Sequence, residues 1–239
     1  MTLTTVGSAR LRRGFAVTAG AALVAGALGT LSLLAQGAPV TSQRILNAAV
    51  EPQNWLTYNG TYNSQRYSTL SQITPQNVTR LESKWVLQNQ VFGAWQSNPI
   101  VVDGVMYLTE RPNDVMAVDA KTGRMFWLYR WTPAADARVC CGANNRGVAI
   151  LGDTLFMGTL DGHLIAIDAK SGRPLWNVVV ADVKLAYSIT LAPLIIKDKV
   201  IVGVGGLWRA PASTPLRTHA QRPTPSWERR WLGDSAAER

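Results

Sequence analysis

The residues of this sequence that could take part in cofactor chemistry are few, and the most unusual are two adjacent cysteines. Cys140 and Cys141 are the only cysteines among 239 residues, and two neighbours cannot close a loop as an ordinary structural disulfide does. Arg146 follows shortly after them, and its planar guanidinium suits a carboxylate. For these residues, a pair of buried thiols and a surface arginine in a salt bridge are the structural alternatives to a functional site. The two histidines, His163 and His219, lie far apart in sequence and are expected to be structural or incidental.

Two copies of an internal repeat lie on either side of Cys140, Cys141 and Arg146 in the sequence. Residues 105–127 match residues 154–176 without a gap at a spacing of 49. Each copy contains two apolar strands joined by a short turn, then an Asp-Ala-Lys-Thr/Ser-Gly turn and a third strand that carries Trp127 or Trp176. The aspartate can accept hydrogen bonds from the turn amides, and the glycine allows a positive φ angle. A third copy begins over 194–204, with Lys-Asp-Lys as its turn.

A period of about 50 residues with several short strands per unit is typical of β-propeller blades. The sequence therefore predicts an all-β fold in which blades stack and the repeated tryptophans fill the space between neighbours. A β-sandwich with chance internal similarity is the alternative.

A short helix and a strand are expected ahead of the first copy. Thr74 as the N-cap and Pro75 at the first helical position predict that a helix begins there. Leu81 and Trp85 then lead into a strand that we expect to begin near Lys84.

The first 37 residues have the features of a signal peptide. Three arginines precede an uncharged apolar run over 15–35, and residues 35–37 offer small side chains at the −3 and −1 positions of a cleavage site. An uncleaved N-terminal anchor is the alternative, since about 20 apolar residues can span a bilayer. Either interpretation places the remainder, from residue 38 onward, in the periplasm, either released or anchored at the inner membrane.

The net charge of +9 is shared equally between the first 37 residues, the last 33 and the long stretch between them. The folded part therefore lacks a basic stripe, and a nucleic-acid partner is not supported.

Residues 207–239 contain four prolines and six arginines, and they interrupt the third repeat in the middle of a blade. We interpret this tail as non-native sequence that follows a frameshift or truncation; a genuine flexible tail is the alternative.

The predicted propeller blades occupy residues 38–206, and the motifs of residues 54–206 within them resemble the pyrroloquinoline quinone (PQQ) dependent alcohol dehydrogenases. The shared motifs are Gln65-Arg66-Tyr67-Ser68, Pro99-Ile100-Val101-Val102-Asp103-Gly104, Cys140-Cys141, Asn145-Arg146-Gly147, the two Asp-Ala-Lys-Thr/Ser-Gly turns and Thr190-Leu191-Ala192-Pro193. The resemblance implies an eight-bladed quinoprotein propeller, of which this chain supplies the first two and a half blades.

The resemblance also assigns residues around the cofactor. It implies that Cys140 and Cys141 form a vicinal disulfide against one face of PQQ, where the strained ring gives a rigid, polarisable platform. It implies that Arg146 binds PQQ oxygens and that Thr190 donates to a PQQ carboxylate. Gln96 stands where many members have a glutamate that contacts PQQ.

Further along the chain, the resemblance implies that the backbone of Gly205 and Gly206 approaches PQQ. The family's first metal ligand, a glutamate, is replaced here by Trp208, which cannot bind a hard cation through oxygen. The family's catalytic aspartate and its remaining ligands for Ca²⁺ or a lanthanide belong to later blades. We therefore predict no catalytic and no metal-binding residue in this chain.

The expected function of the parent protein is oxidation of a small alcohol, with electrons passed to a cytochrome c or a quinone. This chain alone is expected to be inactive. The alternatives are a non-catalytic PQQ-like propeller that serves as a scaffold or binding protein of the cell envelope, and a membrane-anchored structural protein.

Overall fold

The computed structural model describes residues 37–139, 142–206, 218–220 and 231–232, the last two segments by their backbone. The chain divides into two compact units, Met1–Ala38 and Pro39–Arg239, and every helix and strand described lies in the second. Within these described residues, no helix is long and apolar enough to cross a membrane.

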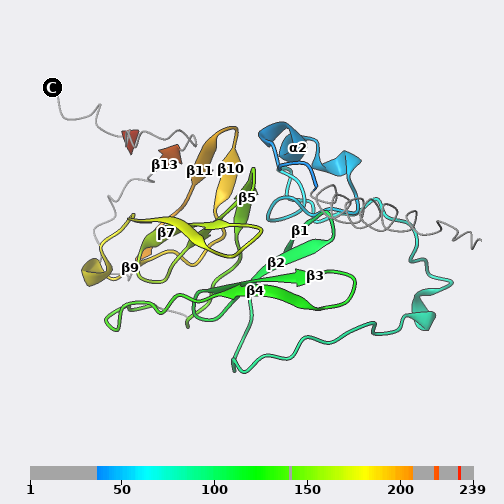
Figure 1. Cartoon of the computed structure of the whole chain (residues 1–239), viewed down its shortest axis with the longest axis horizontal. Coiled ribbons are helices and arrows are strands. Elements are labelled where there is room, and N and C mark those ends of the chain that lie inside the picture. The colour runs from blue at the N-terminus through cyan, green and yellow to red at the C-terminus, as the bar shows by residue number, and fades with distance from the viewer. Residues whose placement is uncertain (1–36, 140–141, 207–217, 221–230, 233–239) are drawn as a thin grey trace, which may run out of the picture. The chain divides into compact units, whose positions relative to one another are not determined.

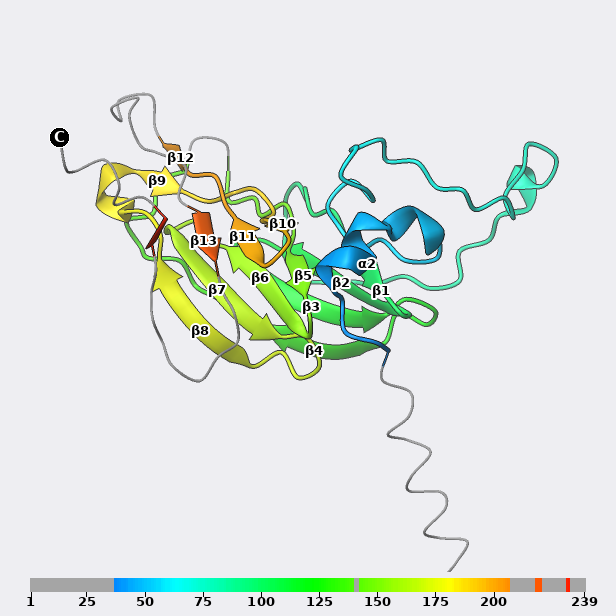
Figure 2. The same cartoon turned by 90° about the horizontal axis from the view of Figure 1, so that it is seen from above.

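Two four-stranded antiparallel sheets form the centre of this unit, and each has its strands in sequence order (Figure 1 and Figure 2). The first contains β1 (Ile100–Val102), β2 (Val105–Glu110), β3 (Asp114–Asp119) and β4 (Met125–Tyr129). The second contains β5 (Ala149–Leu151), β6 (Thr154–Gly158), β7 (His163–Asp168) and β8 (Pro174–Val179). This meander is the form of a propeller blade, so the predicted all-β propeller class is confirmed, as a partial propeller whose sheets do not close.

The two blades share their register as well as their strand order. Val105 pairs with Asp119 in the first blade, and Thr154 pairs with Asp168 in the second. Both blades also have an irregularity between their third and fourth strands, which follows Ala117 in the first and its repeat counterpart in the second. The sequence repeat is therefore a repeat of backbone geometry.

The Asp-Ala-Lys-Thr/Ser-Gly turns work as expected from their residue types. A carboxylate oxygen of Asp119 accepts a hydrogen bond from the N–H of Lys121 at 2.8 Å. In the second blade, Asp168 accepts one from the N–H of Ser171 at 2.7 Å. Gly123 and Gly172 close the turns with φ angles of 73° and 72°, a region that favours glycine.

Each turn is also the docking place of a tryptophan from the preceding blade. Trp127 on β4 donates its Nε1–H to the carbonyl oxygen of Ala169 at 3.1 Å, across the boundary between the blades. Its ring lies on Gly172 so closely that a Cβ at that glycine would be 2.6 Å from the indole. The predicted filling of the inter-blade space by the repeated tryptophan is thus confirmed for Trp127.

Trp85 makes the same contact with the turn of the first blade, although Trp85 itself does not belong to a strand. Its Nε1–H donates to Ala120 at 3.2 Å, and its ring covers Gly123. The strand expected near Lys84 is absent: no strand lies within residues 81–99, whose backbone is joined to the second blade only near its end, at Asn98, and Figure 1 draws this range as a long trace ahead of β1. A strand needs a neighbour for its N–H and C=O groups, and no described strand lies alongside this segment.

The expected helix start at Thr74 is also wrong in detail. Residues 75–77 form a turn, and only a single 3₁₀ turn, η3 (Val78–Arg80), follows it. The capping direction is reversed, because the side chain of Asn77 accepts the N–H of Thr74 at 2.7 Å. Leu81 then returns to an extended conformation, which ends the turn before a second one can form.

The hydrophobic core lies between the sheets and joins them. Its fully buried members include side chains from the first three strands of the two blades and from the segment that leads into the third blade: Ile100, Val115, Leu155, Leu164, Ile165, Ile167 and Ile189. One connected cluster contains residues from all three blades, so the blades stabilise one another.

The third blade is present in part. β10 (Leu194–Ile196) and β11 (Lys199–Ile201) form the predicted hairpin, with Lys197 at a φ angle of 56° in the turn. Two short segments of the tail, β13 (Thr218–Ala220) and β14 (Trp231–Leu232), complete this sheet in the order β10-β11-β13-β14. The non-native origin of the tail remains a prediction.

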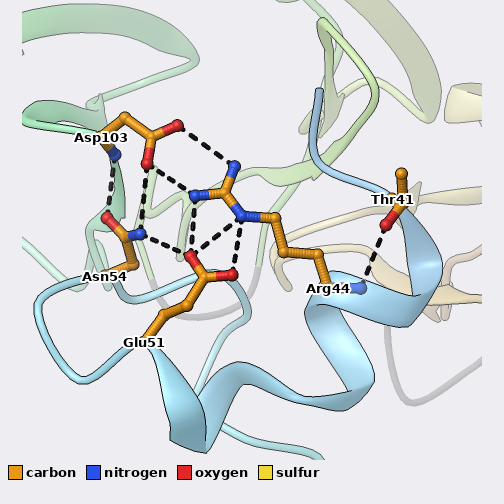
Figure 3. A network of polar contacts seen from close by, with 5 residues as sticks. All are labelled: Thr41, Arg44, Glu51, Asn54 and Asp103. Atoms are coloured by element: carbon orange, nitrogen blue, oxygen red, sulfur yellow. Dashed lines mark hydrogen bonds and ion pairs between the residues drawn. The ribbon is translucent and has the colours of Figure 1, made fainter. Parts of the chain in front are cut away.

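A polar network fastens the segment before the blades onto the first blade (Figure 3). The helix α2 (Ser42–Leu46) is capped by Thr41 and followed by a 3₁₀ turn, η2 (Ala48–Val50). The guanidinium of Arg44 binds Glu51 at 2.7 Å and Asp103, in the β1–β2 turn, at 2.6 Å. These hydrogen bonds hold the pKa values of both carboxyl groups below their usual range.

Candidate cofactor site

The sequence-predicted site residues collect where the innermost strands of successive blades begin. Gln96 lies four residues before β1, Arg146 three residues before β5, and Thr190 four residues before β10. In a propeller the innermost strands surround the central axis, so these positions all face one end of the axial region.

Arg146 and Thr190 are in direct contact. Nη1 of Arg146 donates to the Thr190 hydroxyl at 2.8 Å and to its carbonyl oxygen at 3.2 Å. The backbones are also joined, because the N–H of Arg146 donates to the Thr190 carbonyl at 3.1 Å and the Arg146 carbonyl accepts the N–H of Asn98 at 3.0 Å. The starts of three inner strands are thereby tied together, and Arg146 lies at their centre.

A second row of polar side chains supports Arg146 from behind. Thr109 on β2 donates its hydroxyl to the carbonyl of Asn145 at 3.1 Å, and its N–H donates to the hydroxyl of Ser97 at 2.9 Å. The buried side chain of Asn145 donates to the carbonyl of Gly158 at 2.8 Å and accepts the N–H of Gly147 at 3.0 Å. These residues were not identified from the sequence, although Asn145 stands at the repeat position of Gln96 and Thr190.

Gly147 is required by a close approach of two backbones. Its φ angle is 128°, and a Cβ there would lie 2.9 Å from the carbonyl oxygen of Asn98. No larger residue could occupy this position without separating the first inner strand from the second. The Asn-Arg-Gly motif is thus explained: the asparagine is a buried anchor, the arginine is a donor and the glycine lets the strands meet.

The other predicted contacts are placed less tightly. Gln96 is exposed, two residues from the Asn98 backbone that binds Arg146. Gly205 and Gly206 form β12, which pairs with β9 (Tyr187–Ser188) just before Thr190. The glycine pair is therefore brought beside the Thr190 strand start, as a contact with the same ligand requires.

Three other predictions cannot be followed in the structure. Cys140 and Cys141 lie outside the described residues, as does Trp208. Among the residues that are described, no group of three or more His, Cys, Asp or Glu side chains could hold a metal ion.

Burial disfavours the charged form of the acidic group that ends the second strand of the first blade. Glu110 at the end of β2 is 7% exposed, and burial, followed by the nearby charge of Asp114, raises the pKa of Glu110 above its usual range. The next residue is Arg111, whose guanidinium reaches the loop that leads to Arg146. Arg111 and Arg146 thus bring two guanidinium groups to this region, and their positive charge suits an anion.

This donor set fits an anionic, oxygen-rich cofactor. A guanidinium presents five N–H donors in a fixed fork, and one of the nitrogens of Arg146 is held in place by Thr190. Gly147 allows close approach of the backbone, and the bound threonine sets the direction of the arginine. PQQ, with three carboxylates and an ortho-quinone, has the chemistry that such a site would hold.

Comparison with known proteins agrees with this assignment. Residues 55–211 match the family described as "Glucose/ethanol/alcohol dehydrogenase, beta-propeller domain", and the chain therefore belongs to that PQQ family. The quinohemoprotein alcohol dehydrogenase ADH-IIG of Pseudomonas putida is 44% identical over 174 residues, which make up 71% of this chain and 24% of the relative. The lanthanide-dependent methanol dehydrogenase of Methylacidiphilum fumariolicum is 37% identical over 199 residues, 80% of this chain and 32% of the relative.

A solved structure shows the same arrangement of strands. The structure of ADHIIG from Pseudomonas putida HK5 superimposes with a TM-score of 0.69 at 40% identity, covering 77% of this chain and 27% of that one. The chain thus spans about a quarter to a third of the length of these relatives.

Proposed function

We propose that this chain forms the PQQ-contacting N-terminal blades of a dehydrogenase that oxidises alcohols. The observation that carries the proposal is the Arg146–Thr190 pair, with its hydrogen bond of 2.8 Å, at the meeting point of three inner strands. A cation oriented by a neighbouring hydroxyl and backed by buried polar groups is what an anionic cofactor needs.

The residues of this chain would bind and orient PQQ. Arg146 and Thr190 would donate to its oxygens, and Gln96 would add a neutral hydrogen bond where a charged group is common in the family. Cys140 and Cys141, joined as a vicinal disulfide, would cover one face of the ring. When bound, PQQ supplies a quinone that accepts hydride from the alcohol, next to a Ca²⁺ or lanthanide ion acting as a Lewis acid.

The metal ligands and the catalytic aspartate would come from residues outside this chain. The described residues contain no cluster of metal ligands, and the chain corresponds to about a quarter to a third of its relatives. We therefore expect that the chain with PQQ and Ca²⁺ shows no alcohol-dependent reduction of an artificial dye. Activity above the background without alcohol would contradict this division of labour.

The proposal is tested by measuring how PQQ binds to the full chain, with quenching of tryptophan fluorescence as the signal. Arg146→Met and Thr190→Val should each weaken binding, the former by at least about tenfold, because it removes a charge-assisted hydrogen bond. Arg173→Gln removes the same charge from the exposed outer turn of the second blade and should leave binding unchanged. Equal affinity of the Arg146 variant and the Arg173 variant would refute the site, and absence of binding by the native chain would favour the non-catalytic scaffold.

Export to the periplasm and transfer of electrons to a cytochrome c or a quinone belong to the same proposal. They are supported by the features of residues 1–37 and by the resemblance to exported dehydrogenases. Fractionation of cells that express the chain, with detection in the periplasmic, membrane and cytoplasmic fractions, is the measurement. Recovery in the cytoplasm alone would contradict export.

A further inference from the structure

Arg111 links two segments that approach the proposed site from different blades. It follows β2 directly, and its guanidinium extends away from the sheet between segment 92–93 and loop 142–143. We propose that Arg111 is a positioning residue that fixes loop 142–147 against segment 92–96 and thereby sets the placement of Arg146; as a statement about PQQ binding it rests on the proposed function.

The contacts on the loop side are well defined. Nε of Arg111 donates to the carbonyl oxygen of Ala143 at 3.1 Å, and Nη2 lies 3.7 Å from where a Cβ on Gly142 would be. The same loop is folded on itself, because the N–H of Asn144 donates to the carbonyl of Gly142 at 2.8 Å. Arg111 therefore holds the loop at Ala143, three residues before Arg146.

The other side of the guanidinium lies on the segment before Gln96. Nη1 of Arg111 donates to the carbonyl of Phe92 at 3.4 Å, and a Cβ at Gly93 would be only 1.9 Å from Nη1. Gly93 has a φ angle of 113°, so both its backbone and its missing side chain make room for the arginine. Phe92 is 94% exposed, so its side chain adds little packing here, and the hydrogen bond from Arg111 restrains the backbone at this point.

Loop 142–147 is held by hydrogen bonds at two positions, one near each end. At Arg146 it is tied to the strand starts of the first and third blades by backbone hydrogen bonds, and at Ala143 it is tied to the first blade by Arg111. Releasing the second point leaves Arg146 attached by its backbone but frees the loop before it. A lysine cannot replace the arginine, because one ammonium group cannot reach both carbonyls from opposite sides as a planar fork does.

Hydrogen exchange by mass spectrometry, with PQQ titration of the same full-length proteins, tests the proposal. Arg111→Gln and Arg111→Lys should both speed exchange of the amides in 142–147 and weaken PQQ binding by about tenfold, the effect of one lost charged hydrogen bond. Gly93→Ala should give the same pattern, because the new Cβ displaces the guanidinium without changing the charge. The controls are Arg173→Gln for loss of charge and Gly104→Ala, whose φ angle is 84° and whose Cβ would meet nothing within 4 Å.

The outcomes separate this proposal from the proposed function. Unchanged exchange of 142–147 in the Arg111→Gln and Gly93→Ala variants, at unchanged thermal stability, would overturn it. Full rescue of PQQ affinity by Arg111→Lys would also overturn it, since Arg111 would then act as a charge on the cofactor. If the native chain binds no PQQ, the proposed function fails, whereas the exchange experiment still decides whether Arg111 holds the loop.

Discussion

The contact of Trp127 with Gly172 gives a sharp test of how the blades are held together. Gly172→Ala combines two costs: alanine at a φ angle of 72°, and a Cβ 2.6 Å from the indole ring. Gly104→Ala carries the first cost alone, because its positive φ angle is similar and the space around it is open. We expect the Gly104 variant to lose about 1 kcal/mol of unfolding free energy.

The expected loss for Gly172→Ala is about 3–4 kcal/mol. Beyond the backbone cost, the indole of Trp127 must move, which breaks its 3.1 Å hydrogen bond to Ala169, worth about 1 kcal/mol, and forfeits part of the packing of a large aromatic ring. Urea unfolding followed by far-ultraviolet circular dichroism measures these differences without relying on tryptophan emission.

A double-mutant cycle identifies the source of the loss. In a Trp127→Ala background there is no ring to meet the new Cβ, so Gly172→Ala should cost only the backbone share of about 1 kcal/mol. Additive effects of the two substitutions, or equal costs for Gly172→Ala and Gly104→Ala, would refute the claim that the tryptophan seals the boundary between the blades.

Two further predictions concern the buried and partly buried charges. Arg44→Gln should destabilise the chain by about 2 kcal/mol near neutral pH. The pKa values of Glu51 and Asp103 are lowered by Arg44, so their contribution to stability is present above the unfolded pKa of about 4 and is lost as the pH falls through the lower, folded values. The variant should therefore show a flatter dependence of stability on pH below about pH 5. Asp161→Asn should cost about 1–2 kcal/mol, because the 4% exposed carboxylate accepts the indole N–H of Trp131 at 3.1 Å; an unchanged denaturation midpoint would contradict it.

The parts of the fold that could be predicted from the sequence are those that occur in both copies of the repeat. Two copies at a fixed spacing predict two blades, and the residue types of the turns predict their hydrogen bonds and their positive φ angles. The strand near Lys84 could not be judged in this way, because its pairing depends on a neighbour that is absent from the described strands. A pattern of side chains indicates that the backbone tends to be extended, but a strand forms only where a neighbouring strand pairs with its N–H and C=O groups.

The site shows the same division. Arg146 and Thr190 could be assigned from the resemblance, and the structure brings them together. The support from Asn145 and the link made by Arg111 could not, since both depend on how loops between the repeat copies cross one another. Repeats determine the sheets, whereas contacts between loops are decided only when the sheets have packed.

The docking of each tryptophan on the following blade has a consequence for how the chain is made. Trp127 finds its acceptor 42 residues later in the sequence, and Trp85 finds its own 35 residues later. A chain that emerges N-terminus first, from the ribosome or from a translocation pore, therefore presents each of these two indoles before most of the blade that covers it has followed. Until that blade has followed, the indole is exposed apolar surface of the kind that chaperones bind.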